Sequence, residues 1–166
     1  MNSAFSYRSL RGKIVADTSF QKHFVEPWIR SNWLPEKYGT LFTERILKLA
    51  SGGSFKFDAV NEGGTIAACI STSRCKTASS NYGTGKMHKL RSDMLYLYEA
   101  EGVEQRLIIL TEDDMFLACL SQRRRGRIPL CIEFLHVPLP SELRASLDRS
   151  REISSAEVTP SMISRY

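Results

Sequence analysis

The sequence has few of the residues from which metal centres and disulfide frameworks are built. Its 166 residues include four cysteines and three histidines, and their spacing forms neither a CxxC pair nor a cysteine pair joined to a histidine pair. A structural zinc site is therefore not expected. Cys69, Cys119 and Cys131 stand among apolar residues, where a reduced cysteine serves as a small buried hydrophobe.

Long apolar stretches are also missing. No window reaches the roughly 20 consecutive apolar residues that a membrane-spanning helix needs. The first residues, MNSAFSYRSLRGK, lack the apolar core of a signal peptide. We therefore expect a cytoplasmic protein without membrane contact. The content of 42% hydrophobic and 25% charged residues is that of a globular chain rather than a disordered or fibrous one.

The short motifs of nucleotide binding and of serine hydrolases are incomplete. Residues 82–86 (YGTGK) contain a Gly-Lys pair, but Ser80 and Met87 stand where a phosphate-binding loop needs glycine and Ser or Thr. No serine lies in a GxSxG sequence. The glycines are typical of a loop that caps a helix, and Lys86 and Lys89 at that helix start can still bind a backbone phosphate.

Positive charge is concentrated in a few segments. The chain has 23 Lys and Arg against 18 Asp and Glu, a formal charge of +5. Arginine fits phosphate well because one guanidinium can donate to two oxygens. Runs of charge also mark ordinary solvated faces. The candidate nucleic-acid-binding residues are Arg74, Lys86, Lys89, Arg91, Arg123, Arg124, Arg125 and Arg127.

Hydrophobic periodicity predicts an α/β domain with a mixed central sheet flanked by helices. We expect a basic arm over residues 1–16, one domain over 17–138 and a polar, mostly loose tail over 139–166 with one short helix at 141–150. The expected helices are 18–33, 41–52, 85–99 and 111–122, and the expected strands are 55–60, 65–72, 106–111 and 127–137.

Asp58 is an acid within an apolar strand of the hairpin over residues 55–72, and Glu44 belongs to the helix expected before it. A dry, unpaired carboxylate costs several kcal/mol, so Asp58 needs a cation, a metal or solvent. An exposed edge strand or a cross-strand cation meets that need without any function. Glu44 can likewise be a solvated partner of Lys48 on its helix.

The run from Glu44 through FKFDAVNEGGTIAACISTS, a basic helix and RLIILT resembles the restriction-endonuclease-like PD-(D/E)XK nucleases over roughly residues 38–135. In that superfamily a helical Glu, a strand Asp and an (Asp/Glu)-x-Lys on the next strand bind divalent ions and cut DNA. The resemblance implies Glu44 and Asp58 as catalytic acids and ligands of Mg²⁺ or Mn²⁺. Cys69 and Ser71 replace the second acid and the lysine, so the resemblance gives the lysine's role to a cation further along the chain, Lys76 or Arg74, of which Lys76 is assigned.

We therefore expect a nucleic-acid-associated protein, with DNA favoured over RNA. It would be a weakly active or inactive homologue of the metal-dependent nucleases, because one strand acid and one further carboxylate hold Mg²⁺ poorly. The alternative is a non-catalytic interaction subunit that docks a partner chain or a second copy. Its contact would be the apolar stripe of the first helix, formed by Phe24, Trp28 and Trp33.

Overall fold

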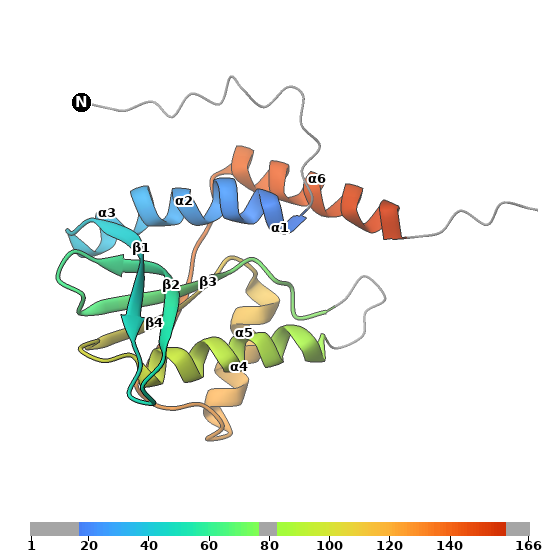
Figure 1. Cartoon of the computed structure of the whole chain (residues 1–166). Coiled ribbons are helices and arrows are strands. Elements are labelled where there is room, and N and C mark those ends of the chain that lie inside the picture. The colour runs from blue at the N-terminus through green and yellow to red at the C-terminus, as the bar shows by residue number, and fades with distance from the viewer. Residues whose placement is uncertain (1–16, 77–82, 159–166) are drawn as a thin grey trace, which may run out of the picture. The chain divides into compact units, whose positions relative to one another are not determined.

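The computed structural model describes residues 17–76 and 83–158 (Figure 1). The expected arm over 1–16, part of the polar loop before residue 83 and the last eight residues lie outside the described residues. The chain divides into two compact units. One consists of Met1–Val25 with Pro140–Tyr166, and the other of Glu26–Leu139.

The unit Glu26–Leu139 is built on a five-stranded sheet with the order β1-β2-β3-β4-β5. The first three strands are antiparallel neighbours, whereas β3, β4 and β5 are parallel. The strands are β1 (Phe42–Lys48), β2 (Ser54–Asn61), β3 (Ile66–Ser71), β4 (Gln105–Leu110) and β5 (Ile132–His136). This mixed sheet flanked by helices confirms the predicted α/β class.

Helices α4 (Thr84–Glu99) and α5 (Asp113–Arg124) connect the parallel strands and lie on the same side of the sheet (Figure 1). Their apolar residues share one core with the strands, as the burial of Leu90, Leu97, Ile108, Met115 and Ile132 shows. The last four residues of β4 are all buried, as expected for a strand covered on both faces. The predictions for α4, α5, β4 and the hairpin are confirmed.

The helix predicted over residues 41–52 is wrong, because this segment forms β1 and a turn. Its apolar residues fit a helical spacing, but pairing with β2 from Phe42 to Lys48 satisfies the backbone and outweighs that pattern. Gly52, with φ 92°, supplies the positive angle in the turn to β2. Glu44 therefore lies on a strand and not on a helix.

Both ends of β1 depart from regular pairing. The register with β2 shifts between Thr43 and Arg45, which is the signature of a β-bulge. Beyond the other end, Ala50 donates a hydrogen bond to the carbonyl of Glu99 (2.8 Å), and Glu101 donates to the carbonyl of Lys48 (3.0 Å). The segment after α4 therefore lies against the end of this strand.

Residues 17–38 form a helical run that is longer than the predicted 18–33. Wide π-helical turns, η2 (Gln21–Val25) and η3 (Ile29–Trp33), alternate with α1 (Asp17–Phe20), α2 (Glu26–Trp28) and α3 (Leu34–Tyr38). Each π-helical turn is followed two residues later by Pro27 or Pro35, whose rings crowd the preceding turn and lack an N–H. Gly39, with φ 66°, ends the run.

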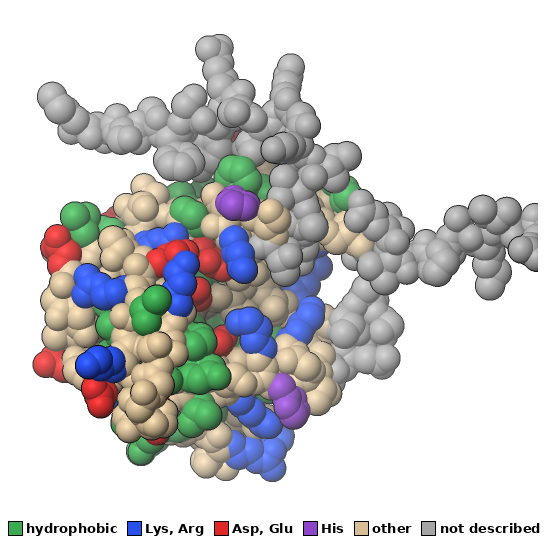
Figure 2. Space-filling view, in the orientation of Figure 1, with side chains coloured by type: hydrophobic (Ala, Val, Ile, Leu, Met, Phe, Trp, Pro, Cys, Tyr) green, Lys and Arg blue, Asp and Glu red, His purple; other side chains and the backbone are tan. Residues whose placement is uncertain are grey.

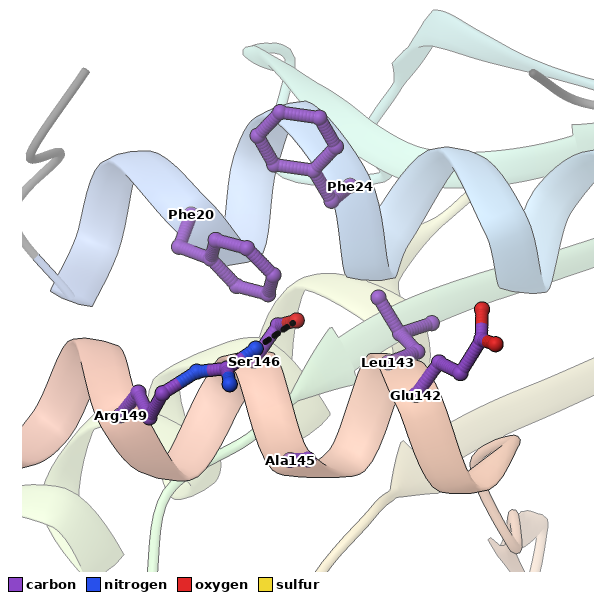
Figure 3. Close-up of a pocket in the computed structure, with 7 residues that line it drawn as sticks. All are labelled: Phe20, Phe24, Glu142, Leu143, Ala145, Ser146 and Arg149. Carbon is purple, nitrogen blue, oxygen red and sulfur yellow. Dashed lines mark hydrogen bonds between the residues drawn. The ribbon is translucent and has the colours of Figure 1, made fainter. Parts of the chain in front are cut away.

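The unit formed by the two chain ends contains the short helix that was expected at 141–150, and this helix is longer than predicted. Residues Ser141–Val158 form α6, so part of the tail that was expected to be loose is helical. Leu143 and Leu147 are buried at a spacing of four, which gives a polar, serine-rich segment one apolar stripe. Phe20 and Phe24 face this stripe across a pocket of about 330 Å³ (Figure 3).

None of the helices within the described residues is long and apolar enough to cross a bilayer. The 18-residue α6 approaches the length of a membrane span, but it carries acidic and basic side chains along its whole length.

Candidate functional site

The candidate site begins where β2 and β3 separate. The two strands pair through Ala59↔Ala68 and Val60↔Ala67 and no further toward Asp58. There the carboxylate of Asp58 accepts a hydrogen bond from the backbone N–H of Ile70 (2.7 Å). A side chain thus takes the place that a main-chain carbonyl fills elsewhere in the ladder.

Two further buried acids act on Asp58. Glu26 of α2 is 5% exposed and Asp93 of α4 is 6% exposed. Burial raises the pKa of Asp58 from 3.8 to about 6, and the negative charges of Glu26 and Asp93 contribute to the rise. The hydrogen bond from Ile70 and the charge of Lys89 oppose it. We call Glu26, Asp58 and Asp93 the acid cluster.

Lys89 is the cation of this cluster. Its ammonium donates a hydrogen bond to Asp93 (2.9 Å), one helical turn further along α4. Burial lowers the pKa of Lys89, but the hydrogen bond and the charges of Asp93 and Asp58 outweigh it and raise that pKa. Burial raises the pKa of Asp93 in spite of Lys89. The sequence singled out Lys89 for phosphate binding and missed this contact.

The positions expected to hold the second acid and the lysine carry no charge. Burial, followed by the charges of Asp93 and Asp58, raises the pKa of the Cys69 thiol well above its ordinary value. A neutral buried thiol is a poor nucleophile and a poor metal ligand. The hydroxyl of Ser71 accepts a hydrogen bond from the backbone N–H of Ser73 (3.2 Å), so it serves the turn after β3.

Glu44 is exposed on β1, and its carboxylate forms ion pairs with Lys56 and with Arg30. The guanidinium of Arg30 also donates to the main-chain carbonyl of Asp58. Glu44 is thus tied to the strand of Asp58 through Arg30, but the carboxylates that act on Asp58 are Glu26 and Asp93. The helical acid beside Asp58 is therefore Glu26.

The sequence analysis missed Glu26, although its spacing from nearby apolar residues indicates burial. Glu26 stands three residues before Ile29 and seven before Trp33, which places it on the same stripe of a helix as these apolar residues. A carboxylate on such a stripe is exceptional, since Glu is almost never fully buried without a partner.

Lys76 lies beyond the end of β3, close to the first turn of α5. Its backbone N–H donates to the carboxylate of Asp114 (3.3 Å), as does that of Cys75 (2.8 Å). Arg74 pairs with Glu112 through its Nε atom at 3.4 Å. The structure therefore brings Asp58 together with Lys89, and it places Lys76 against α5 instead.

The described part of the chain does not fit a magnesium or manganese centre. No three His, Cys, Asp or Glu side chains within residues 17–76 and 83–158 are placed so that they could share a metal ion. Asp58 accepts a backbone N–H, and Glu44 is engaged with two cations. The two ligands that the sequence suggested are thus occupied by other partners.

Several of the predicted phosphate-binding cations are exposed on this unit. Figure 2 shows Lys and Arg side chains together over the part of the surface that α4 forms. Arg123 differs, because its guanidinium donates to the carbonyl of Ile132 and lies 4.7 Å from the ring of Phe134. The exposed residues among these candidates are Arg74, Lys89, Arg91, Arg124, Arg125 and Arg127, and Lys86 is half-buried.

The chain was compared with protein-family models, with curated proteins and with solved structures, and none of the three comparisons found a match. The fold class therefore rests on the order and direction of the strands, which form a mixed sheet in an α/β protein. Its candidate site is read from the contacts of Asp58, Asp93 and Lys89.

Proposed function

We propose that this chain binds nucleic acid through the side of the unit Glu26–Leu139 that α4 and α5 cover. The observation that carries the proposal is the exposure of Arg91 on α4 and of Arg124, Arg125 and Arg127 around the end of α5. Both helices lie on the same side of the sheet (Figure 1). Exposed cations gathered on one side favour a polyanion, because each neutralised phosphate releases counterions.

We further propose that the fold is restriction-endonuclease-like. A helix, three antiparallel strands, a crossover helix and a parallel strand follow one another, and β1 supplies a strand that the sequence interpretation had missed. The acids of the resemblance then correspond to Glu26 on the helix and Asp58 on the strand. DNA is the proposed nucleic acid, since this resemblance is to enzymes that cut DNA.

Weak or absent nuclease activity belongs to the same proposal. Cys69 and Ser71 stand where a second carboxylate and a lysine would be needed, and the residues that the structure describes include no group of three acids, cysteines or histidines placed to share a metal ion. Any residual cleavage in Mn²⁺ would have to depend on Asp58. Cleavage that persists unchanged in an Asp58→Ala variant would remove that residue from the assignment.

The test is fluorescence anisotropy with labelled duplex DNA, single-stranded DNA and RNA, in chelator, over a series of salt concentrations. We expect the logarithm of the association constant for duplex DNA to fall linearly with the logarithm of the salt concentration, with a slope of about 0.9 per contacted phosphate. Arg91→Ala should lower the magnitude of that slope by about 1, which corresponds to the loss of one phosphate contact. The exposed Lys48, at the end of β1, gives the control Lys48→Ala. Absence of binding at low salt would overturn the proposal.

The alternative of a protein-interaction subunit loses part of its surface in this structure. Phe24 lines the pocket against α6 (Figure 3), and the ammonium of Lys37 lies 5.7 Å from the ring of Trp33. These residues of the apolar stripe therefore have neighbours within the chain. A dimer or complex that persists in high salt would favour the alternative, and light scattering over the same salt series separates the two.

A further inference from the structure

The connection between α5 and β5 carries the most exposed large hydrophobic side chain of the described residues. Leu130 is 90% exposed and lies in the turn that precedes β5. The next most exposed such residue, Ile46, is 65% exposed. Single exposed leucines are common on protein surfaces, but the surroundings of this one are unusual.

Three arginines precede Leu130 in the same connection. Arg124 is the last residue of α5, Arg125 and Arg127 follow it, and all three are exposed. No acidic residue stands between residues 115 and 132, so this segment carries positive charge only. One apolar tip thus lies in a segment with several guanidinium groups, which bind phosphate oxygens well.

Hydrogen bonds fix the turn on both sides of its tip. Before the tip, the backbone N–H of Arg127 donates to the carbonyl of Gln122 (3.1 Å). After it, the backbone N–H of Ile132 donates to the carbonyl of Pro129 (3.2 Å). Leu130 is therefore held on an ordered turn, and a partner that contacts it does not have to order a loose loop first.

We propose that Leu130 inserts as a wedge between two adjacent base pairs of bound duplex DNA, while the arginines that precede it contact the phosphates. Architectural DNA-binding proteins insert apolar side chains such as Leu in this way, which unstacks one base step and bends the duplex. The inference rests on the proposed function and adds to it the kind of distortion that binding imposes on the DNA.

A lipid surface is the other partner that an apolar tip among cations can meet. Binding to a bilayer scales with the apolar area that is buried, and even one myristoyl chain binds only marginally. Leu130 offers less apolar area than such a chain, and the neighbouring Ile128 is buried. A single side chain is sufficient, by contrast, to open one base step. Duplex DNA is therefore the partner that this turn fits.

The test compares the affinities of the chain for two short duplexes of the same sequence, measured by fluorescence anisotropy at low salt. One duplex is fully paired, and the other has two adjacent mismatches at its centre. Mismatched bases cost less free energy to unstack. The unaltered chain should therefore bind the mismatched duplex at least about tenfold more tightly, a difference of about 1.4 kcal/mol. Leu130→Ala should bring the two affinities together.

Leu117→Ala is the matched control, because Leu117 is 61% exposed but lies on α5 and not in the turn. It should keep the preference for the mismatched duplex, and so should Leu130→Met, which retains an apolar wedge. Arg127→Ala should weaken binding to both duplexes by the same factor and lower the magnitude of the salt slope by about 1. Urea unfolding of Leu130→Ala should match that of the unaltered chain, since an exposed side chain contributes little to stability.

Two results would overturn the inference and leave the proposed DNA binding in place. One is binding of the unaltered chain to both duplexes with equal affinity, and the other is a preference that Leu130→Ala retains. Absence of binding to either duplex would remove both proposals. Cosedimentation with vesicles of phosphatidylcholine and phosphatidylserine covers the lipid surface. If Leu130→Ala loses vesicle binding and keeps the duplex preference, the leucine serves a membrane and the wedge is wrong.

Discussion

Asp58 accepts a hydrogen bond from the main-chain N–H of Ile70, twelve residues further along the chain. The same carboxyl therefore closes the backbone pairing between β2 and β3 and takes up a proton at an unusually high pH. Its structural role and its ionisation are coupled, and the stability of the fold should report that coupling.

Lowering the pH from 7.5 to 5 should stabilise the protein. The pKa of Asp58 is raised to about 6 in the folded chain, so between about pH 6 and pH 4 the folded state binds a proton that the unfolded state does not. Stability therefore rises as pH falls through this window. The shift corresponds to roughly 3 kcal/mol at most, and the raised pKa of Asp93 acts in the same direction.

Urea unfolding at the two pH values measures this difference. The charged groups that face Asp58 are Glu26, Asp93 and Lys89, and the pKa of Lys89 is raised, so it stays protonated throughout. Asp58→Asn should flatten the pH dependence, whereas Glu104→Gln at an exposed position should keep it. An equally steep dependence in Asp58→Asn would contradict the assignment.

Asp114→Ala should loosen the segment that follows β3. The Asp114 carboxylate accepts hydrogen bonds from the backbone N–H groups of Cys75 and Lys76. Their loss should cost about 1–3 kcal/mol of unfolding free energy and speed hydrogen exchange at these two amides. Asp113→Ala is the control, because the side chain of Asp113 is 85% exposed and pairs with His136. Unchanged exchange at Cys75 in Asp114→Ala would rule out this role.

Replacement by Met should lower the stability of the protein at Arg123 and leave it nearly unchanged at Arg124. Arg123 holds the carbonyl of Ile132 and lies over Phe134, so we expect Arg123→Met to lose about 1–2 kcal/mol of stability. Arg124 is exposed, so its replacement should change stability by at most about 0.5 kcal/mol.

The effects on DNA binding should be reversed. Arg124→Met should weaken duplex binding and lower its salt slope, because an exposed guanidinium is available to phosphate. Arg123→Met should change affinity little once both variants are measured below their unfolding temperatures. A larger loss of affinity from Arg123→Met would mean that this guanidinium leaves Ile132 to reach the ligand.

Leu147→Ala tests whether α6 is an integral part of its unit. Leu147 is fully buried, so its truncation should cost about 2–5 kcal/mol. Hydrogen exchange in α6 should accelerate in parallel with the loss of helical circular dichroism. Ala145→Gly, at an exposed position of the same helix, controls for helix propensity, with a cost of about 1 kcal/mol. Equal effects of the two changes would mean that α6 packs on nothing.

The parts of the fold that the sequence predicts well have a single strong pattern. The apolar run of β4 and the turn NEGG between β2 and β3 leave few alternatives. The segment over 41–52 failed because its helical spacing is local information, whereas β1 exists through pairing with β2, which no local pattern displays. Only the first part of α6, residues 141–150, was predicted, because the polar composition of the tail was interpreted as a loose segment.

The candidate site was predicted only in part. Asp58 was found because a charge within an apolar strand is locally visible. Its partners come from α2 and α4, and contacts between distant segments require the assembled fold. Glu44 and Lys76 were assigned from the resemblance to the nuclease motif, whereas the charges that act on Asp58 are those of Glu26, Asp93 and Lys89.

The edge of the sheet at β1 bears on how the protein behaves when concentrated. An exposed edge strand can recruit the same strand of another molecule and start aggregation. Here a strand approaching β1 would meet the Glu99–Glu101 backbone at one end and the bulge beside Glu44 at the other. The charges of Arg45 and Lys48 further disfavour such an approach. The chain thus covers one end of this edge with its own backbone.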